Sequence, residues 1–243
     1  MFSVKIAEHD FRIYNRHSYI ERLCRDYIEQ DSTNAFEITV SDNEIEREKI
    51  PGEFHPEPYL ESTAVYRKMC EHLIEDGLFL FHSSAVSTDG HAILFAAPSG
   101  TGKSTHAKLW RQVFGDRVTI INDDKPLIKI IDSCADKSSE AIVFGTPWSG
   151  KHDLQHNVCA PVRAVVLIEQ SQTNSIEEIS ARDAYPMVLN QTYRPNNARL
   201  MAETLSLVSS FTKAVKFYKL KCNISEDAVH TVYNELYPLI SDK

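Results

Sequence analysis

The sequence predicts an α/β protein with a mixed sheet, preceded by a small α+β module. Apolar stretches of strand length alternate with segments whose apolar residues have helical spacing. Two strand-like stretches, 78–87 and 91–96, are separated by Asp89-Gly90, which favours a hairpin and therefore a sheet that is not purely parallel. A proline-rich stretch at 51–58 separates the first fifty residues from the rest.

The first fifty residues predict a strand at 11–15, a helix at 18–30 and a strand at 35–40. The stretch that follows contains three prolines and one glycine, and it cannot continue a helix or a central strand. We therefore expect a small module of residues 1–55 and a core of residues 56–243.

The core opens with a predicted helix at 62–77, where Gly77 provides a C-terminal stop. The hairpin follows, and then a helix at 103–114. Alternating apolar patterns predict the remaining elements, which are strands at 118–122, 126–131, 140–145, 162–169 and 214–222 and helices near 181–190, 197–212 and 225–239.

Composition excludes several classes of function. The 243 residues carry a formal net charge of −8, which argues against a general nucleic-acid binder or a membrane-surface binder. No apolar run reaches the length needed to span a membrane, and the N-terminus lacks the pattern of a signal peptide. The five cysteines form no CxxC pair, which indicates reduced, structural residues. We expect a cytoplasmic protein.

The stretch Ala97-Pro-Ser-Gly-Thr-Gly-Lys-Ser104 matches the phosphate-loop pattern GxxxxGK[ST] except at its first position, where Ala97 replaces glycine. Glycines allow successive backbone N–H groups to point at phosphate oxygens, and the N-terminus of the next helix adds positive charge. The lysine can neutralise β- and γ-phosphates, and the Ser104 hydroxyl can bind Mg²⁺. The predicted nucleotide-binding residues are Ser99, Gly100, Thr101, Gly102, Lys103, Ser104 and Thr105.

The alternative interpretation of this loop is a Gly/Ser turn that happens to contain a lysine. The order of strand, loop and helix is the one that the phosphate-loop motif requires, so we favour a site for ATP with Mg²⁺.

Two carboxylates follow the apolar strand at 118–121. Adjacent side chains on an extended chain point to different sides, so Asp123 and Asp124 can serve a metal ion and an incoming hydroxyl separately. The alternative is a solvated turn before Pro126, since Asn-Asp-Asp is good turn chemistry.

Four stretches, HSSAV (82–86), APSGTGKST (97–105), INDDKP (121–126) and GTPWSGK (145–151), occur together in an order that resembles the catalytic domain of HPr kinase/phosphorylase. That family shares its phosphate-loop kinase core with ATP-dependent phosphoenolpyruvate carboxykinase, and the resemblance covers roughly residues 60–240.

The resemblance implies transfer of the γ-phosphoryl group of ATP to a serine hydroxyl. It also implies that His82 lies beside the catalytic acid and that the paired aspartates supply the general base and part of the metal site. We expect Asp123 to be the base and Ser104 and Asp124 to bind the metal, with the reverse division between the two aspartates left open. The first fifty residues look unlike the usual N-terminal domain of the family, and the loop ends in Ser-Thr where Ser-Glu is usual. The chain looks more like stand-alone relatives that modify peptides, so HPr itself is a doubtful substrate.

Three further candidates each have a structural alternative. His82 can assist Asp123, or simply cap a buried strand. Lys151 can stabilise the transferring phosphoryl group, or lie on the surface of a turn that packs Trp148. Arg194 precedes a proline in an extended loop, and it can bind a phosphate or carboxylate of the substrate, or form a surface ion pair.

The sequence therefore predicts a serine-type kinase that acts on a protein or peptide, with no nucleic-acid or membrane partner; a homo-oligomer is left open. Two alternatives remain, which are a kinase of a small metabolite close to the carboxykinase side, and a nucleotide-binding regulatory module without turnover.

Overall fold

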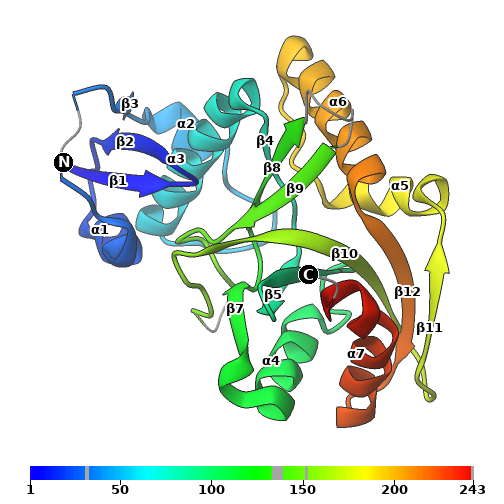
Figure 1. Cartoon of the computed structure of the whole chain (residues 1–243). Helices are drawn as coiled ribbons and strands as arrows, with labels where there is room; N and C mark the ends of the chain where they lie inside the picture. The colour runs from blue at the N-terminus through cyan, green and yellow to red at the C-terminus, as the bar shows by residue number, and fades with distance from the viewer. Residues whose placement is uncertain (31–32, 133–138, 151–152, 242–243) are drawn as a thin grey trace. The chain divides into compact units, whose positions relative to one another are not determined.

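The computed structural model describes residues 1–30, 33–132, 139–150 and 153–241, and the chain forms two compact units, Met1–Asp76 and Gly77–Lys243 (Figure 1). The first unit extends beyond the expected boundary at residue 55. The reason is that the helix after the proline cluster is part of the small unit: the Glu61 carboxylate, which is fully buried, accepts hydrogen bonds from the backbone N–H groups of Arg16 and His17 at 2.5 and 3.1 Å.

The first unit contains a three-stranded sheet in which β1 and β2 are antiparallel and β2 and β3 are parallel. Its elements are β1 (Phe2–Ile6), β2 (His9–Ile13), α1 (Ser18–Leu23), a 3₁₀ helix at Arg25–Tyr27, β3 (Phe36–Ile38), α2 (Asp42–Glu46), α3 (Glu57–Leu73) and a 3₁₀ helix at Ile74–Asp76. Ser41 and Glu44 form a capping box that begins α2. The sequence did not predict β1 or α2.

The second unit contains a mixed sheet in the order β4-β8-β9-β10-β6-β5-β7, with β12 pairing to both β10 and β11. The strands of its described residues are β4 (Leu78–Leu80), β5 (Ser84–Thr88), β6 (His91–Ala96), β7 (Val118–Asn122), β8 (Leu127–Asp132), β9 (Ser139–Phe144), β10 (Cys159–Gln170), β11 (Ser175–Ile179) and β12 (Lys216–Cys222). The β5–β6 hairpin turns at Asp89 and Gly90, both of which have positive φ. This confirms the predicted mixed α/β class.

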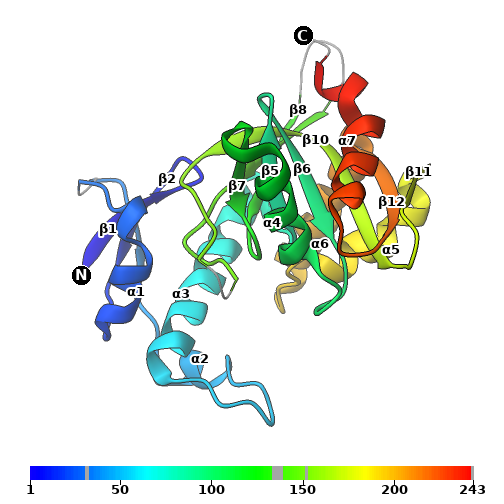
Figure 2. The same cartoon turned by 90° about the horizontal axis from the view of Figure 1, so that it is seen from below.

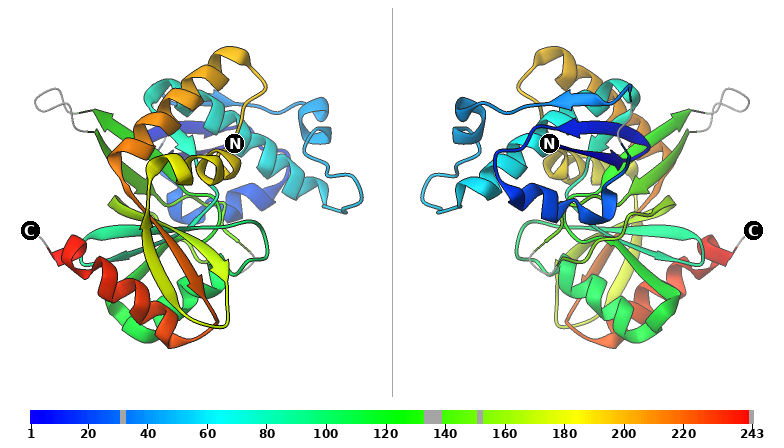
Figure 3. Two further views of the ribbon diagram at one scale, coloured as in Figure 1. Left: turned by 90° about the vertical axis from the view of Figure 1, so that its right-hand side faces the viewer. Right: turned by 90° about the vertical axis from the view of Figure 1, so that its left-hand side faces the viewer.

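Helices cover both faces of this sheet (Figures 2 and 3). They are α4 (Lys103–Phe114), followed by a 3₁₀ turn at Gly115–Arg117, α5 (Ala181–Gln191), α6 (Ala198–Ala214) and α7 (Glu226–Ser241). Helices α4 and α7 pack on one core with Phe95 and Val166, whereas α5 and α6 pack on the other with Leu94 and Val165. Successive residues of β6 and β10 thus face opposite cores, as strand geometry requires. No helix of the described chain is long and apolar enough to cross a membrane.

The strand directions decide where a ligand can bind. β6 runs parallel to β10, and β10 runs parallel to β12. β6 and β7 are both antiparallel to β5, so they are parallel to each other. The carboxyl ends of β6, β7, β10 and β12 therefore lie along one edge of the sheet, the usual location of ligand sites in α/β proteins.

Candidate active site

The loop between β6 and α4 has the backbone that the phosphate-loop pattern predicts. Gly100 and Gly102 have φ values of +79° and +114°, a region in which residues with a Cβ are strained. Space is not the reason for glycine here, because an added Cβ would meet nothing within 4 Å at either position. The conformation is the requirement, and it turns the chain directly into α4 at Lys103.

Helix α4 begins without a side-chain cap. Gly102 occupies the N-cap position and has no side chain that could accept a hydrogen bond from the first turn. The first N–H groups of a helix have no partner inside the helix, and the helix dipole gives them partial positive charge. With Pro98–Gly100 exposed at the surface, these groups are suited to bind an anion such as a phosphate.

Lys103 bends back across the base of the loop. Its side chain is 6% exposed, and its Nζ donates a hydrogen bond to the carbonyl oxygen of Ala97 at 2.8 Å. Burial lowers the pKa of Lys103, and the nearby Asp124 carboxylate opposes that shift. An ammonium group has three donors, so the bond to Ala97 leaves capacity for phosphate oxygens.

The acidic turn after β7 is organised by Asn122. The Oδ1 atom of this fully buried residue accepts hydrogen bonds from the N–H groups of Asp124 and Lys125, both at 2.8 Å. Its Nδ2 atom donates to the backbone oxygens of Thr146 and Trp148. The Asn-Asp-Asp turn that the sequence suggested is therefore present, and its hydrogen bonds hold the two carboxylates in place.

The two carboxylates point in different directions, as the extended chain predicts. Asp123 is 1% exposed, and its Oδ1 accepts a hydrogen bond from the Gly150 N–H at 2.6 Å. The Asp124 side chain is 20% exposed and forms ion pairs with Lys125 and with His82. One carboxylate is therefore covered by the 145–150 segment, and the other faces the loop side of the site.

His82 contacts the second aspartate. Its Nδ1 lies 3.5 Å from Asp124 Oδ1, which differs from the expectation that His82 assists Asp123. Burial lowers the pKa of His82, Asp124 raises it, and the positive charges of Lys103 and Lys125 lower it further. When His82 Nδ1 carries a hydrogen, it can donate to the Asp124 carboxylate.

The loop and the acidic turn meet at Ser104. Its Oγ lies 3.4 Å from the backbone oxygen of Asp123, and Ser84 Oγ donates to the same oxygen at 3.0 Å. The electrostatic coupling between Lys103 and Asp124 also requires the two segments to be close. The phosphate-loop lysine and serine are therefore adjacent to the acidic pair, although twenty residues separate them in the chain.

The GTPWSGK segment covers the acidic turn. Gly145 is required by close approach, because a Cβ there would lie 2.0 Å from the backbone oxygen of His156. At Gly150 a Cβ would lie 2.9 Å from Asp123 Oδ2. The predicted catalytic residue Lys151 follows directly, but it lies outside the described residues.

Arg194 is exposed on the loop after α5. This loop runs beside the segment that joins β4 to β5: the Tyr193 N–H donates to the Leu80 oxygen at 3.1 Å, and the His82 N–H donates to the Gln191 oxygen at 2.7 Å. The contact of Arg194 with a substrate stays a prediction.

Sequence reasoning gave no role to Ser84, Asn122, Lys125 or Thr146, all of which hold the acidic turn. Thr146 Oγ1 donates to the Lys125 oxygen at 2.8 Å and accepts from Asn122 Nδ2 at 3.2 Å. All four lie inside the quoted motifs. The sequence could not show the hydrogen bonds that join Ser84 to Asp123, or Thr146 to Asn122 and Lys125, because these residues are remote in the chain.

The site offers oxygen donors, the ligand type that Mg²⁺ takes. Among the described residues no group of three or more His, Cys, Asp and Glu side chains is arranged to hold a metal ion. Mg²⁺ in nucleotide sites takes one or two carboxylates together with phosphate oxygens and water. The Ser104 hydroxyl and the carboxylates of the acidic pair are oxygen donors of that kind.

Comparison with known proteins gives a distant likeness of fold. No protein family matches the chain, and no curated protein matches its sequence. Among the solved structures that match is the Hpr(Ser) kinase/phosphatase from Coxiella burnetii, at 10% identity and a TM-score of 0.36, over 66% of this chain and 97% of that one. Because both values are low, the likeness adds nothing to the assignment of the site, which depends on its own geometry.

Proposed function

We propose that this protein is an ATP-dependent kinase that transfers the γ-phosphoryl group to a serine-type hydroxyl of a protein or peptide. One observation carries the proposal: a phosphate-type loop, with its lysine and serine, lies against a pair of aspartates, one of which lies 3.5 Å from a half-buried histidine, His82. Phosphoryl transfer requires positioned cations, a metal site and a proton acceptor, and this arrangement has candidates for each.

In the proposed complex the backbone N–H groups of 99–105 and Lys103 bind the triphosphate. Ser104 and Asp123 would hold Mg²⁺, which when bound neutralises charge on the β- and γ-phosphate oxygens. The acceptor oxygen forms a bond to the γ-phosphorus as the bond to the β–γ bridging oxygen breaks, and ADP leaves.

We assign the hydroxyl proton to Asp124 rather than to Asp123. Asp124 is the more exposed carboxylate, and His82 lies beside it, whereas Asp123 is covered by Gly150. A general base must reach the proton that it removes, and this favours Asp124. This reverses the division between the two aspartates that was expected from the sequence. Lys151 and Arg194 remain candidates to stabilise the transferred group.

The test is incubation with γ-labelled ATP and a panel of serine-containing peptides and hydroxyl-bearing metabolites. The proposal expects label on at least one peptide, and loss of labelling in Asp124→Asn. Label on a metabolite alone would favour a small-molecule kinase. Binding of ATP without labelling or hydrolysis would favour a regulatory module and contradict the proposal.

A further inference from the structure

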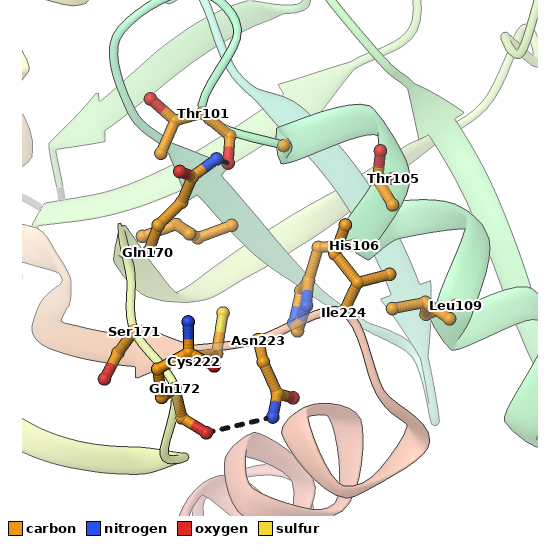
Figure 4. A pocket seen from close by; sticks show the side chains of 12 residues that line it. Thr101, Thr105, His106, Leu109, Gln170, Ser171, Gln172, Cys222, Asn223 and Ile224 are labelled. Atoms are coloured by element: carbon orange, nitrogen blue, oxygen red, sulfur yellow. Dashed lines mark hydrogen bonds between the residues drawn. The ribbon is translucent and has the colours of Figure 1, made fainter.

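A cavity of about 540 Å³ borders the phosphate loop on the α4 face of the sheet (Figure 4). Its walls come from three places: the loop and first turns of α4, the end of β10, and the end of β12. The side chain of Gln170 closes one side by donating a hydrogen bond to the backbone oxygen of Thr101 at 3.2 Å. The volume lies within the range of roughly 300–1,000 Å³ that is usual for small-molecule sites.

The topology puts this cavity on the opposite side of the loop from the aspartates. β5 and β7, which carry the acidic turn, flank β6 on one side, and β10 and β12 flank it on the other. The four strands that run in one direction, β6, β7, β10 and β12, end at the same edge of the sheet. A triphosphate on the loop whose terminal phosphate faces Asp124 therefore directs its other end toward β10 and β12.

The lining is neutral and partly apolar. Among the described residues that form it there is no Asp, Glu, Lys or Arg. Burial lowers the pKa of His106 to about 4, so this ring is uncharged at neutral pH, and its Nε2 accepts a hydrogen bond from Trp110. Leu109 and Ile224 provide apolar surface, and Ile224 is 78% exposed.

The rim of the cavity is held in place by side-chain amides. Asn223 Nδ2 donates to the Gln172 oxygen at 3.2 Å, and the Asn223 N–H donates to Asn174 Oδ1 at 3.0 Å. Ile224 follows directly and is carried by this short connection between β12 and α7. A neutral cavity with an ordered rim and apolar sides suits a flat heterocycle with a sugar attached, rather than a charged group.

We propose that this cavity receives the base and ribose of the nucleotide, with Ile224 and Leu109 covering the base. The inference rests on the proposed nucleotide site and extends it to the nucleoside end, for which the sequence has no signal. It explains why a large apolar side chain is exposed beside the phosphate loop.

A second cavity, of about 930 Å³, borders the loop on the α5 face and is the competing location. Its lining includes the charged residues Glu169, Asp183 and Lys219 together with Met187. Both cavities are bordered by β10 and β12, so they differ in their lining rather than in their side of the loop. The charged side chains of the second cavity suit a polar group better than a nucleobase.

The experiment measures binding of Mg·ATP and of Mg²⁺ with inorganic tripolyphosphate by calorimetry. Ile224→Glu should weaken ATP binding at least tenfold and leave tripolyphosphate binding within about twofold, because the triphosphate alone does not enter the cavity. Ile224 is exposed, so the substitution leaves the fold intact. Met187→Glu tests the second cavity, and Ile131→Glu is the matched control at another exposed isoleucine, which is 41% exposed on β8. Both should leave the two affinities within about twofold.

Four outcomes overturn the inference. Unchanged ATP affinity in Ile224→Glu rejects this cavity, and selective loss of ATP binding in Met187→Glu moves the nucleoside to the other one. Wild-type protein that binds tripolyphosphate as tightly as ATP has no nucleoside site, although the phosphate site survives. If wild-type protein binds neither ligand, the proposed function fails, and the inference fails with it.

Discussion

The phosphate loop and the acidic turn lie at the ends of β6 and β7, but they are held by different means. The loop owes its form to the backbone of Gly100 and Gly102, and its first residues are exposed. The acidic turn is buried and is held by side chains, above all that of Asn122. Changes in the loop are therefore expected to act mainly on ligand binding, whereas changes around the turn should cost more stability.

Within the acidic turn, the sharpest contrast is between its two carboxylates. Asp124→Asn is expected to lower turnover by about a thousandfold or more, because the amide cannot accept the hydroxyl proton, while the Kd of Mg·ATP stays within about fivefold. Turnover and calorimetry check this. Asp123→Asn should instead raise the Mg²⁺ concentration needed for half-maximal activity.

The control for both variants is Asp116→Asn, since this carboxylate is fully exposed and pairs with Arg111. It should behave as wild type. Full turnover in Asp124→Asn would contradict the proposed proton acceptor.

Gly145→Ala tests the packing under the acidic turn. Its Cβ would lie 2.0 Å from the His156 oxygen and 2.8 Å from the Ile121 oxygen, so we expect a loss of about 3 kcal/mol in the free energy of unfolding. Urea denaturation measures it. Gly90 also has a positive φ, but an added Cβ there would meet open space. Gly90→Ala should therefore lower the free energy of unfolding by only about 1 kcal/mol. Equal losses in the two variants would show that the close approach is not the cause.

His106→Gln examines the buried ring beside the loop. In the folded protein its pKa is lowered to about 4, from 6.5 in the unfolded chain, so the unfolded state alone takes up this proton as the pH falls between those values. As the pH falls from 6.5 to 4, the wild type should lose up to about 3 kcal/mol of its free energy of unfolding through this group. The variant has no such group and should not show this loss. Denaturation at pH 7, 6, 5 and 4 tests this. The glutamine carbonyl can still accept from Trp110, and identical pH slopes would contradict the shift.

Gly102→Ala has the smallest expected effect and tests the loop itself. The strain of a Cβ at φ +114° should cost about 1–2 kcal/mol of stability and weaken Mg·ATP binding about tenfold. Gly115→Ala, at the other end of α4 and also at positive φ, should cost similar stability without weakening binding. Calorimetry separates the two, and equal loss of binding in both would show that the effect is general.

The sequence predicted the elements that carry the site more accurately than their surroundings. The strand at 118–122 and the helix at 103–114 are observed as predicted, because apolar periodicity and the glycines mark them locally. The predicted strand at 78–87 is instead two strands, β4 and β5, because Phe81 and His82 hydrogen-bond to Pro126 and Gln191, which are remote in the chain. Such pairings leave no local signal.

The elements that the sequence did not predict are short or exposed. α2 has five residues, too few for helical periodicity to appear, and β11 is a largely exposed strand whose one sheet neighbour in the described chain is β12. The helix predicted at 18–30 ends at Leu23 and continues as a 3₁₀ turn. The contact of His82 with Asp124 also could not be predicted, since motif order does not say which of two adjacent carboxylates faces a third residue.

The most direct measurement of the central claim is the affinity of wild-type protein and Lys103→Met for Mg·ATP, by calorimetry. The wild type should bind one ATP per chain, and the variant, which keeps the length of the side chain but loses its charge, should bind at least about thirtyfold more weakly. Equal affinities, or a wild type that binds no ATP, would show that the loop at 97–105 is not a phosphate site.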